Sequence, residues 1–152
     1  MNSLPASVIT MYRALVGAAE RLSWLAPLLM RLVFGYFWLE TGWAKLHNLD
    51  GFTERFISWG IPFPAFSAGL SAWAEFIGGG LMMAGLATRA TMVAMIVNML
   101  VAMALVVLPT ISTLDEFVEL DETIYVLALF WLLMAGPGKA SLDHLIAKRL
   151  EA

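Results

Sequence analysis

Several charged side chains stand inside long apolar stretches or at their ends, and four of them are the best placed for chemistry. Arg31 and Lys45 share one stretch. Glu75 precedes the triple glycine 78–80, and Glu122 lies in the outer part of the last stretch. Glu40 lies about 180° from Arg31 on the same helix, where it faces another helix, a second subunit or the lipid headgroups. A charge within a bilayer normally faces protein or water and has a partner. Such groups can bind a small anion or a carbonyl oxygen and relay protons. Alternatively, they only fix the register of the helices.

Helical periodicity gathers several of these residues on one face. At 100° per residue, a stripe within about 80° carries two cations, two glycines and a tryptophan: Arg31, Gly35, Trp38, Gly42 and Lys45. Glycine lets another backbone or a ligand approach closely. The stripe therefore predicts either a helix contact or a ligand pocket.

Glu75 lies on a second face made mainly of small residues, which are Ala68, Ser71, Ala72, Gly79 and Met82. At about 1.5 Å per residue, Arg31 and Glu75 differ in depth by only about 7 Å in a core of about 30 Å. We therefore predict an Arg31–Glu75 pair. Lys45 and Glu122, both near the outer ends of their helices, form the predicted second pair, or else reach to the membrane interface.

The elements that carry these residues are predicted to be four transmembrane helices. The chain is 61% hydrophobic, with a mean hydropathy of +0.80, which exceeds the usual value for soluble domains. A span needs about 20 mainly apolar residues. The stretches that fit this length are 24–46, 66–88, 90–109 and 114–135. We expect an all-α integral membrane four-helix bundle and a single membrane domain over 1–152.

Charge asymmetry predicts the orientation of this bundle. The N-terminal segment, the middle connection and the C-terminal tail carry most of the cations, which are Arg13, Arg21, Arg89, Lys139, Lys148 and Arg149. The positive-inside rule then places both termini in the cytoplasm, and we expect a bacterial cytoplasmic membrane. Residues 1–23 read as an interfacial amphipathic segment, and residues 139–152 as a cytoplasmic amphipathic tail.

Local signals mark where the helices begin and end. Thr113-Leu-Asp-Glu116 fits a capping box, so the fourth span should begin there. Gly136-Pro137-Gly138 should end it. A short outer helix is expected over 52–59.

Composition also excludes several classes of function. The chain has no cysteine, so thiolate metal sites and disulfide exchange are excluded, and a net charge of −3 argues against nucleic acid. Standard catalytic motifs are missing, so we expect no self-sufficient enzyme. A methionine stripe could carry Cu(I) or simply fill gaps in the core, and we expect no metal site; its members are Met92, Met95, Met99 and Met103.

The same residues carry a family resemblance over about 25–146. The stretch R-L-V-F-G-Y-F-W-L-E-T-G-W-A-K-L (31–46) resembles the opening pattern of the DoxX family. Three further stretches resemble the later signatures of that family: G-I-P-F-P (60–64), W-A-E-F-I-G-G-G-L-M-M-A-G-L-A-T-R (73–89) and G-P-G-K-A-S-L-D (136–143). The shared positions are Arg31, Gly35, Gly42, Lys45, Glu75, Gly79 and Glu122. The resemblance implies a four-helix membrane protein linked to membrane redox complexes, or an accessory factor.

Two functions follow from the residues and the resemblance. In the first, the chain is a membrane subunit of a redox-associated complex and binds a quinone or small ligand at the Arg31/Lys45/Glu75/Glu122 cluster. In the second, it is a non-enzymatic accessory, assembly or transport-assisting protein whose buried charges are structural. Both predict a lipid bilayer around the chain, with further copies or other membrane or redox subunits as partners.

Overall fold

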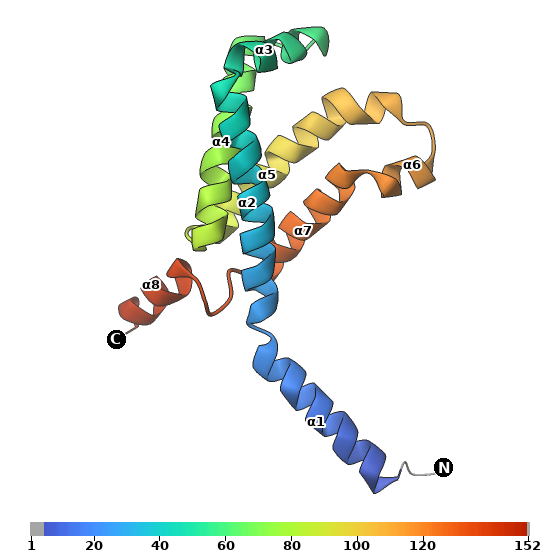
Figure 1. Cartoon of the computed structure of the whole chain (residues 1–152), viewed down its shortest axis with the longest axis vertical. Coiled ribbons are helices and arrows are strands. Elements are labelled where there is room, and N and C mark those ends of the chain that lie inside the picture. Colours follow the sequence, from blue (N-terminus) through green and yellow to red (C-terminus); the bar gives the residue numbers. More distant parts are fainter. Residues whose placement is uncertain (1–4, 152) are drawn as a thin grey trace.

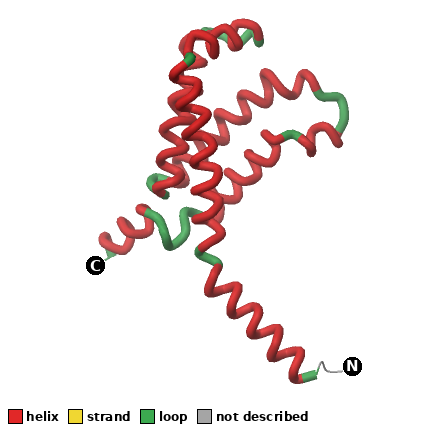
Figure 2. Tube along the Cα trace, viewed as in Figure 1, coloured by secondary structure: helices red, strands yellow, loops and turns green. Residues whose placement is uncertain are grey.

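The protein is entirely helical over the residues that the computed structural model describes, 5–151. Four helices form its body: α2 (Leu25–His47), α4 (Pro64–Ala84), α5 (Thr88–Ala102) and α7 (Asp121–Ala135). Short helices flank them: α1 (Ala6–Leu22), α3 (Leu49–Ser58), α6 (Leu114–Glu119) and α8 (Leu142–Leu150). Figure 2 shows that loops connect these helices and that strands are missing from the described part. The predicted all-α class is therefore confirmed.

Helices α2 and α4 pack side by side along their length because glycines remove the side chains between them (Figure 1). A Cβ on Gly42 would clash with the backbone of Phe76, and one on Gly79 would clash with the backbone of Leu39. A Cβ on Gly35 would lie 2.9 Å from the carbonyl oxygen of Gly79. The glycine stripe predicted as either a helix contact or a ligand pocket is thus occupied by a neighbouring helix.

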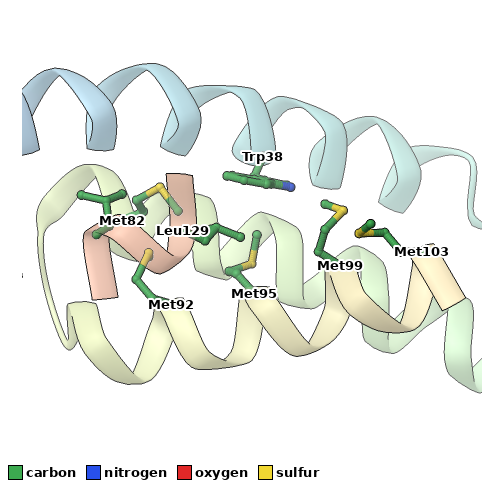
Figure 3. Packing of buried hydrophobic residues seen from close by; sticks show 8 residues of the cluster. Trp38, Met82, Met92, Met95, Met99, Met103 and Leu129 are labelled. Carbon is green, nitrogen blue, oxygen red and sulfur yellow. The ribbon is translucent and has the colours of Figure 1, made fainter. Parts of the chain in front are cut away.

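The main core joins this pair to α5 and α7. The methionine stripe of α5 is buried there, and Figure 3 shows it facing Trp38 of α2 and Leu129 of α7. Tyr125 of α7 also packs on Trp38, with ring centroids 5.6 Å apart. Unbranched thioether side chains fill irregular gaps of this kind. The structure therefore uses the stripe for packing.

The helices occupy most of the predicted stretches, with two differences. The stretch 114–135 is not one helix: the capping box of Thr113 and Glu116 begins α6, and the chain then extends at Leu120 before α7 starts. The stretch after α5 continues as a π-helix (Met103–Val107) and a 3-10 turn (Leu108–Thr110), where Pro109 lacks the N–H that an α-helix needs. The predicted stop at Gly136 is confirmed, and the predicted outer helix is α3.

Helix α1 stands away from the body. Figure 1 shows α1 projecting beyond the end of α2, and none of its residues Ala6–Leu22 is buried.

By length and composition, the stretch Thr88–Thr110 can cross a membrane on its own. Helices α1 and α2 meet the same criterion as a pair bent by 45°. Residues 1–4 of the predicted interfacial segment and residue 152 of the tail lie outside the described residues.

Candidate functional site

The central polar contact of the protein is an ion pair between α2 and α4. The Nζ of Lys45 donates to both carboxylate oxygens of Glu75 at 2.5 Å. The Oγ1 of Thr41 donates to the same carboxylate at 3.1 Å. Glu75 is 5% exposed, so its carboxylate is shielded from solvent and its charge is balanced by these donors.

The packing register of the two helices explains why Lys45 is the partner. The backbone of Gly42 meets Ala72 and Phe76, which brings Thr41 level with Glu75. Because side chains tilt toward the N-terminus of a helix, Lys45 reaches back from the end of α2 to the same level. The pairs predicted from depth, Arg31–Glu75 and Lys45–Glu122, are therefore wrong. The prediction assumes helices with aligned ends, whereas α4 begins beyond the end of α2: Gly42, five residues before that end, meets Ala72, eight residues after the start of α4.

Arg31 belongs to a different structure near the other end of α2. It lies beside Gly85, about 15 Å along the helix from Thr41, and it is 1% exposed. Its Nη2 donates to the carbonyl oxygen of Ala140 at 2.5 Å. Since Ala140 precedes α8, Arg31 ties the C-terminal segment to the bundle.

Asp143 completes this clasp, which we define as Arg31, Gly85, Ala140 and Asp143. Its carboxylate accepts from the backbone N–H groups of Ala87 and Thr88 at 2.7 and 2.8 Å. Asp143 thus caps the N-terminus of α5 from a distant segment. Burial acts to raise the pKa of Asp143, but these hydrogen bonds and the charge of Arg31 outweigh it and hold that pKa below its ordinary value.

A cleft of about 860 Å³ lies beside the Lys45–Glu75 pair. Figure 1 shows that α2 and α4 diverge from α5 and α7 toward this end of the protein. Its walls are mainly apolar, from Phe37 and Trp38 on one side to Val97 and Leu105 on the other. The side chain of Lys45 is 29% exposed, whereas that of Glu75 is 7% exposed. The remaining polar groups of the lining are Thr41, Arg55, Ser67, Ser71, Asn98, Glu122 and Tyr125.

The structure divides the predicted site residues into three groups. Trp38, Lys45, Glu75 and Glu122 line the cleft, although Glu122 and Lys45 are not paired. Glycines 35, 42 and 79 form the α2–α4 contact. Arg31 lies in the clasp. The predicted cluster is therefore not one pocket.

Two polar contacts of this region were not predicted from the sequence, namely those of Thr41 and Asp143. Thr41 stands four residues before Lys45, so helical spacing alone would have placed it on the same face. Asp143 stands in the stretch G-P-G-K-A-S-L-D, but its role as a cap depends on a contact with a loop more than fifty positions away. Only the fold reveals that contact.

An all-helical chain with an apolar exterior and charges held between its helices is typical of integral membrane proteins. The chain belongs to the DoxX family, whose family model matches residues 26–108. It is also 30% identical over 135 residues to an uncharacterized membrane protein of Mycobacterium tuberculosis, covering 81% of this chain and 82% of that relative. No solved structure matches the chain.

Proposed function

We propose that this DoxX membrane protein binds an amphipathic ligand of the quinone class in the cleft and serves as a membrane subunit of a redox-associated complex. One observation carries the proposal: the cleft joins an apolar volume of about 860 Å³ to the Lys45–Glu75 pair. Ligand sites are typically apolar cavities of about 300–1,000 Å³ with a few convergent polar groups. The redox association rests on the family resemblance.

The lining groups suit both the polar ring and the apolar chain of such a ligand. Lys45 has three N–H donors, two of which point at Glu75. The third can donate to a quinone carbonyl oxygen. The ring would lie among Phe37, Trp38 and Tyr125, and the chain would follow the aliphatic wall of α5. Glu75, whose carboxylate accepts from the ammonium group, is the residue placed to take up a proton from a hydroxyl group of a reduced quinone.

The proposal includes a topology of four crossings. The crossing elements would be α2, α4, the continuous stretch from Thr88 to Thr110, and α7, with both termini in the cytoplasm of a bacterium. The cleft would then open toward the outer half of the membrane. Helix α7 has 15 residues, or about 22 Å, so it would need the local bilayer to thin or α6 to lie in the interface.

Titration with decylubiquinone tests the binding. The full chain is placed in phosphatidylcholine nanodiscs, and quenching of its tryptophan fluorescence is measured. We expect saturable quenching, lost in Ala74→Trp because Ala74 lines the cleft. Gly69→Ala is the control, since a Cβ at Gly69 meets nothing within 4 Å. Quenching that never saturates, or that Ala74→Trp leaves unchanged, would refute binding in the cleft.

A second candidate is the accessory role, in which the charges serve structure alone. The clasp favours it, because Arg31 holds the C-terminal segment and touches no part of the cleft. Glu75→Gln separates the two functions. Assembly without electron transfer supports the redox role, whereas loss of folding supports the structural role.

A further inference from the structure

Glu40 places a carboxylate on the outward face of α2, away from α4 and from the cleft. Its side chain is exposed, and within residues 5–151 the structure gives it neither a hydrogen bond nor an ion pair. Its neighbours on this face are large and exposed: Val33 (63%), Tyr36 (58%) and Trp43 (54%). We name these four residues the α2 outer face.

The position of Glu40 along α2 is incompatible with a lipid-facing surface. It lies about 10 Å from the end of the helix at His47. If α2 crosses the membrane as proposed above, this places the carboxylate inside the hydrocarbon. Ionisable groups at such depth pair with one another or face a protein interior.

A second copy of the chain cannot neutralise Glu40. Within the described crossing elements, Arg31 is buried in the clasp and Lys45 is bound to Glu75. His47 is the last residue of α2, seven positions beyond Glu40, and its Nδ1 lies 2.9 Å from the carbonyl oxygen of Trp43. Arg89 stands at the start of α5, near the opposite end of the bundle. A symmetric contact through this face would bring two Glu40 carboxylates together, which is unfavourable.

From this charge pattern we propose that the α2 outer face binds a transmembrane helix of a different protein, which carries Lys or Arg at the depth of Glu40. The contact combines an ion pair in a low-dielectric medium with packing against Tyr36 and Trp43. None of the four residues of this surface lines the cleft. Partner binding and ligand binding can therefore be tested separately.

Fluorescence resonance energy transfer between the labelled chain and designed helices tests whether the partner must carry a cation opposite Glu40. The labelled full chain is reconstituted in phosphatidylcholine vesicles with Leu/Ala transmembrane helices that bear Lys, Leu or Glu at the matching depth. We expect transfer above the random level for the Lys helix alone. Glu40→Gln should reduce it to the level of the Leu helix, and Glu40→Lys should redirect it to the Glu helix. Equal transfer to all three helices, or transfer unaffected by Glu40→Gln, would overturn the proposal.

Photo-crosslinking from Val33 in native membranes tests whether the partner is another protein. The expected adduct joins a peptide that contains Lys or Arg about two turns from the crosslinked position, because Glu40 lies seven residues after Val33 on α2. This adduct should disappear in Glu40→Gln. A crosslinker at Leu127, exposed on α7, is the matched control. An adduct between two copies of this chain, or adducts with lipid alone, would overturn the proposal. Quinone titration of Glu40→Gln should remain unchanged, so failure here is distinct from failure of the cleft.

Discussion

The Nζ of Lys45 lies 2.5 Å from both carboxylate oxygens of Glu75, and this ion pair joins the two most extensively packed helices of the protein. It stands at the edge of an apolar cleft rather than in a closed core. Arg31, the other cation of the stripe, lies well away from it and holds the C-terminal segment. The two cations of α2 therefore have different roles.

The ion pair should contribute measurably to stability. We expect a double-mutant cycle of Lys45→Ala and Glu75→Ala to give a coupling of about 0.5–3 kcal/mol. The value should lie in the lower half of that range, because the partly exposed ammonium is screened. The measurement is denaturant unfolding in detergent. Additive single substitutions would contradict a direct interaction.

The glycine contact between α2 and α4 should not tolerate a methyl group. Gly42→Ala should destabilise the protein by about 1–3 kcal/mol or more, because the added Cβ meets backbone atoms that cannot rotate away. Gly69→Ala, in open space on α4, should instead gain up to about 1 kcal/mol from helix propensity. Thermal unfolding of both variants tests this, and equal shifts would contradict the close contact.

These glycines illustrate how far the sequence could predict the fold and the site. Periodicity placed Gly35, Gly42 and Lys45 on one face, because the geometry of a helix is local and regular. The partner of Glu75 could not be predicted, since the register between α2 and α4 depends on where each glycine meets the other backbone. The break at Leu120 could not be predicted, because the stretch 114–135 contains no glycine or proline that would interrupt a helix.

The clasp should weaken in acid. Because the pKa of Asp143 is lowered in the folded state, its contribution is complete above the ordinary carboxyl value of about 4 and is lost as pH falls through the lower folded value. Asp143→Ala should remove this dependence and cost about 0.5–2 kcal/mol, the usual range for loss of a helix cap. Unfolding measured between pH 3 and pH 7, roughly the range in which carboxyl groups titrate, tests both effects. An unchanged pH profile in the variant would contradict the cap.

Loss of the clasp should also release the C-terminal segment. Arg31→Ala removes the donor to the carbonyl oxygen of Ala140, so trypsin should cleave faster after the adjacent Lys139. Cleavage after Arg13, on exposed α1, should not change and serves as the internal control. Equal cleavage at Lys139 in the variant and the parent protein would show that Arg31 does not hold the segment.

The proposed topology can be tested cleanly because the chain has no cysteine. Single substitutions Ser58→Cys and Ser112→Cys should react with a membrane-impermeant maleimide from outside the cell. Lys148→Cys should react only after the membrane is opened. The reverse pattern would invert the orientation, and labelling of Ser58→Cys and Ser112→Cys on opposite sides would exclude four crossings.

Mapping of the quinone on the chain tests the central proposal most directly. The protein in nanodiscs is irradiated with an azidoquinone, and the labelled peptides are identified by mass spectrometry. The expected adducts lie on 37–45 of α2 and 67–75 of α4, and excess decylubiquinone or Ala74→Trp abolishes them. Adducts confined to α1 and other lipid-exposed surfaces, unchanged by competitor, would show that the cleft binds no quinone.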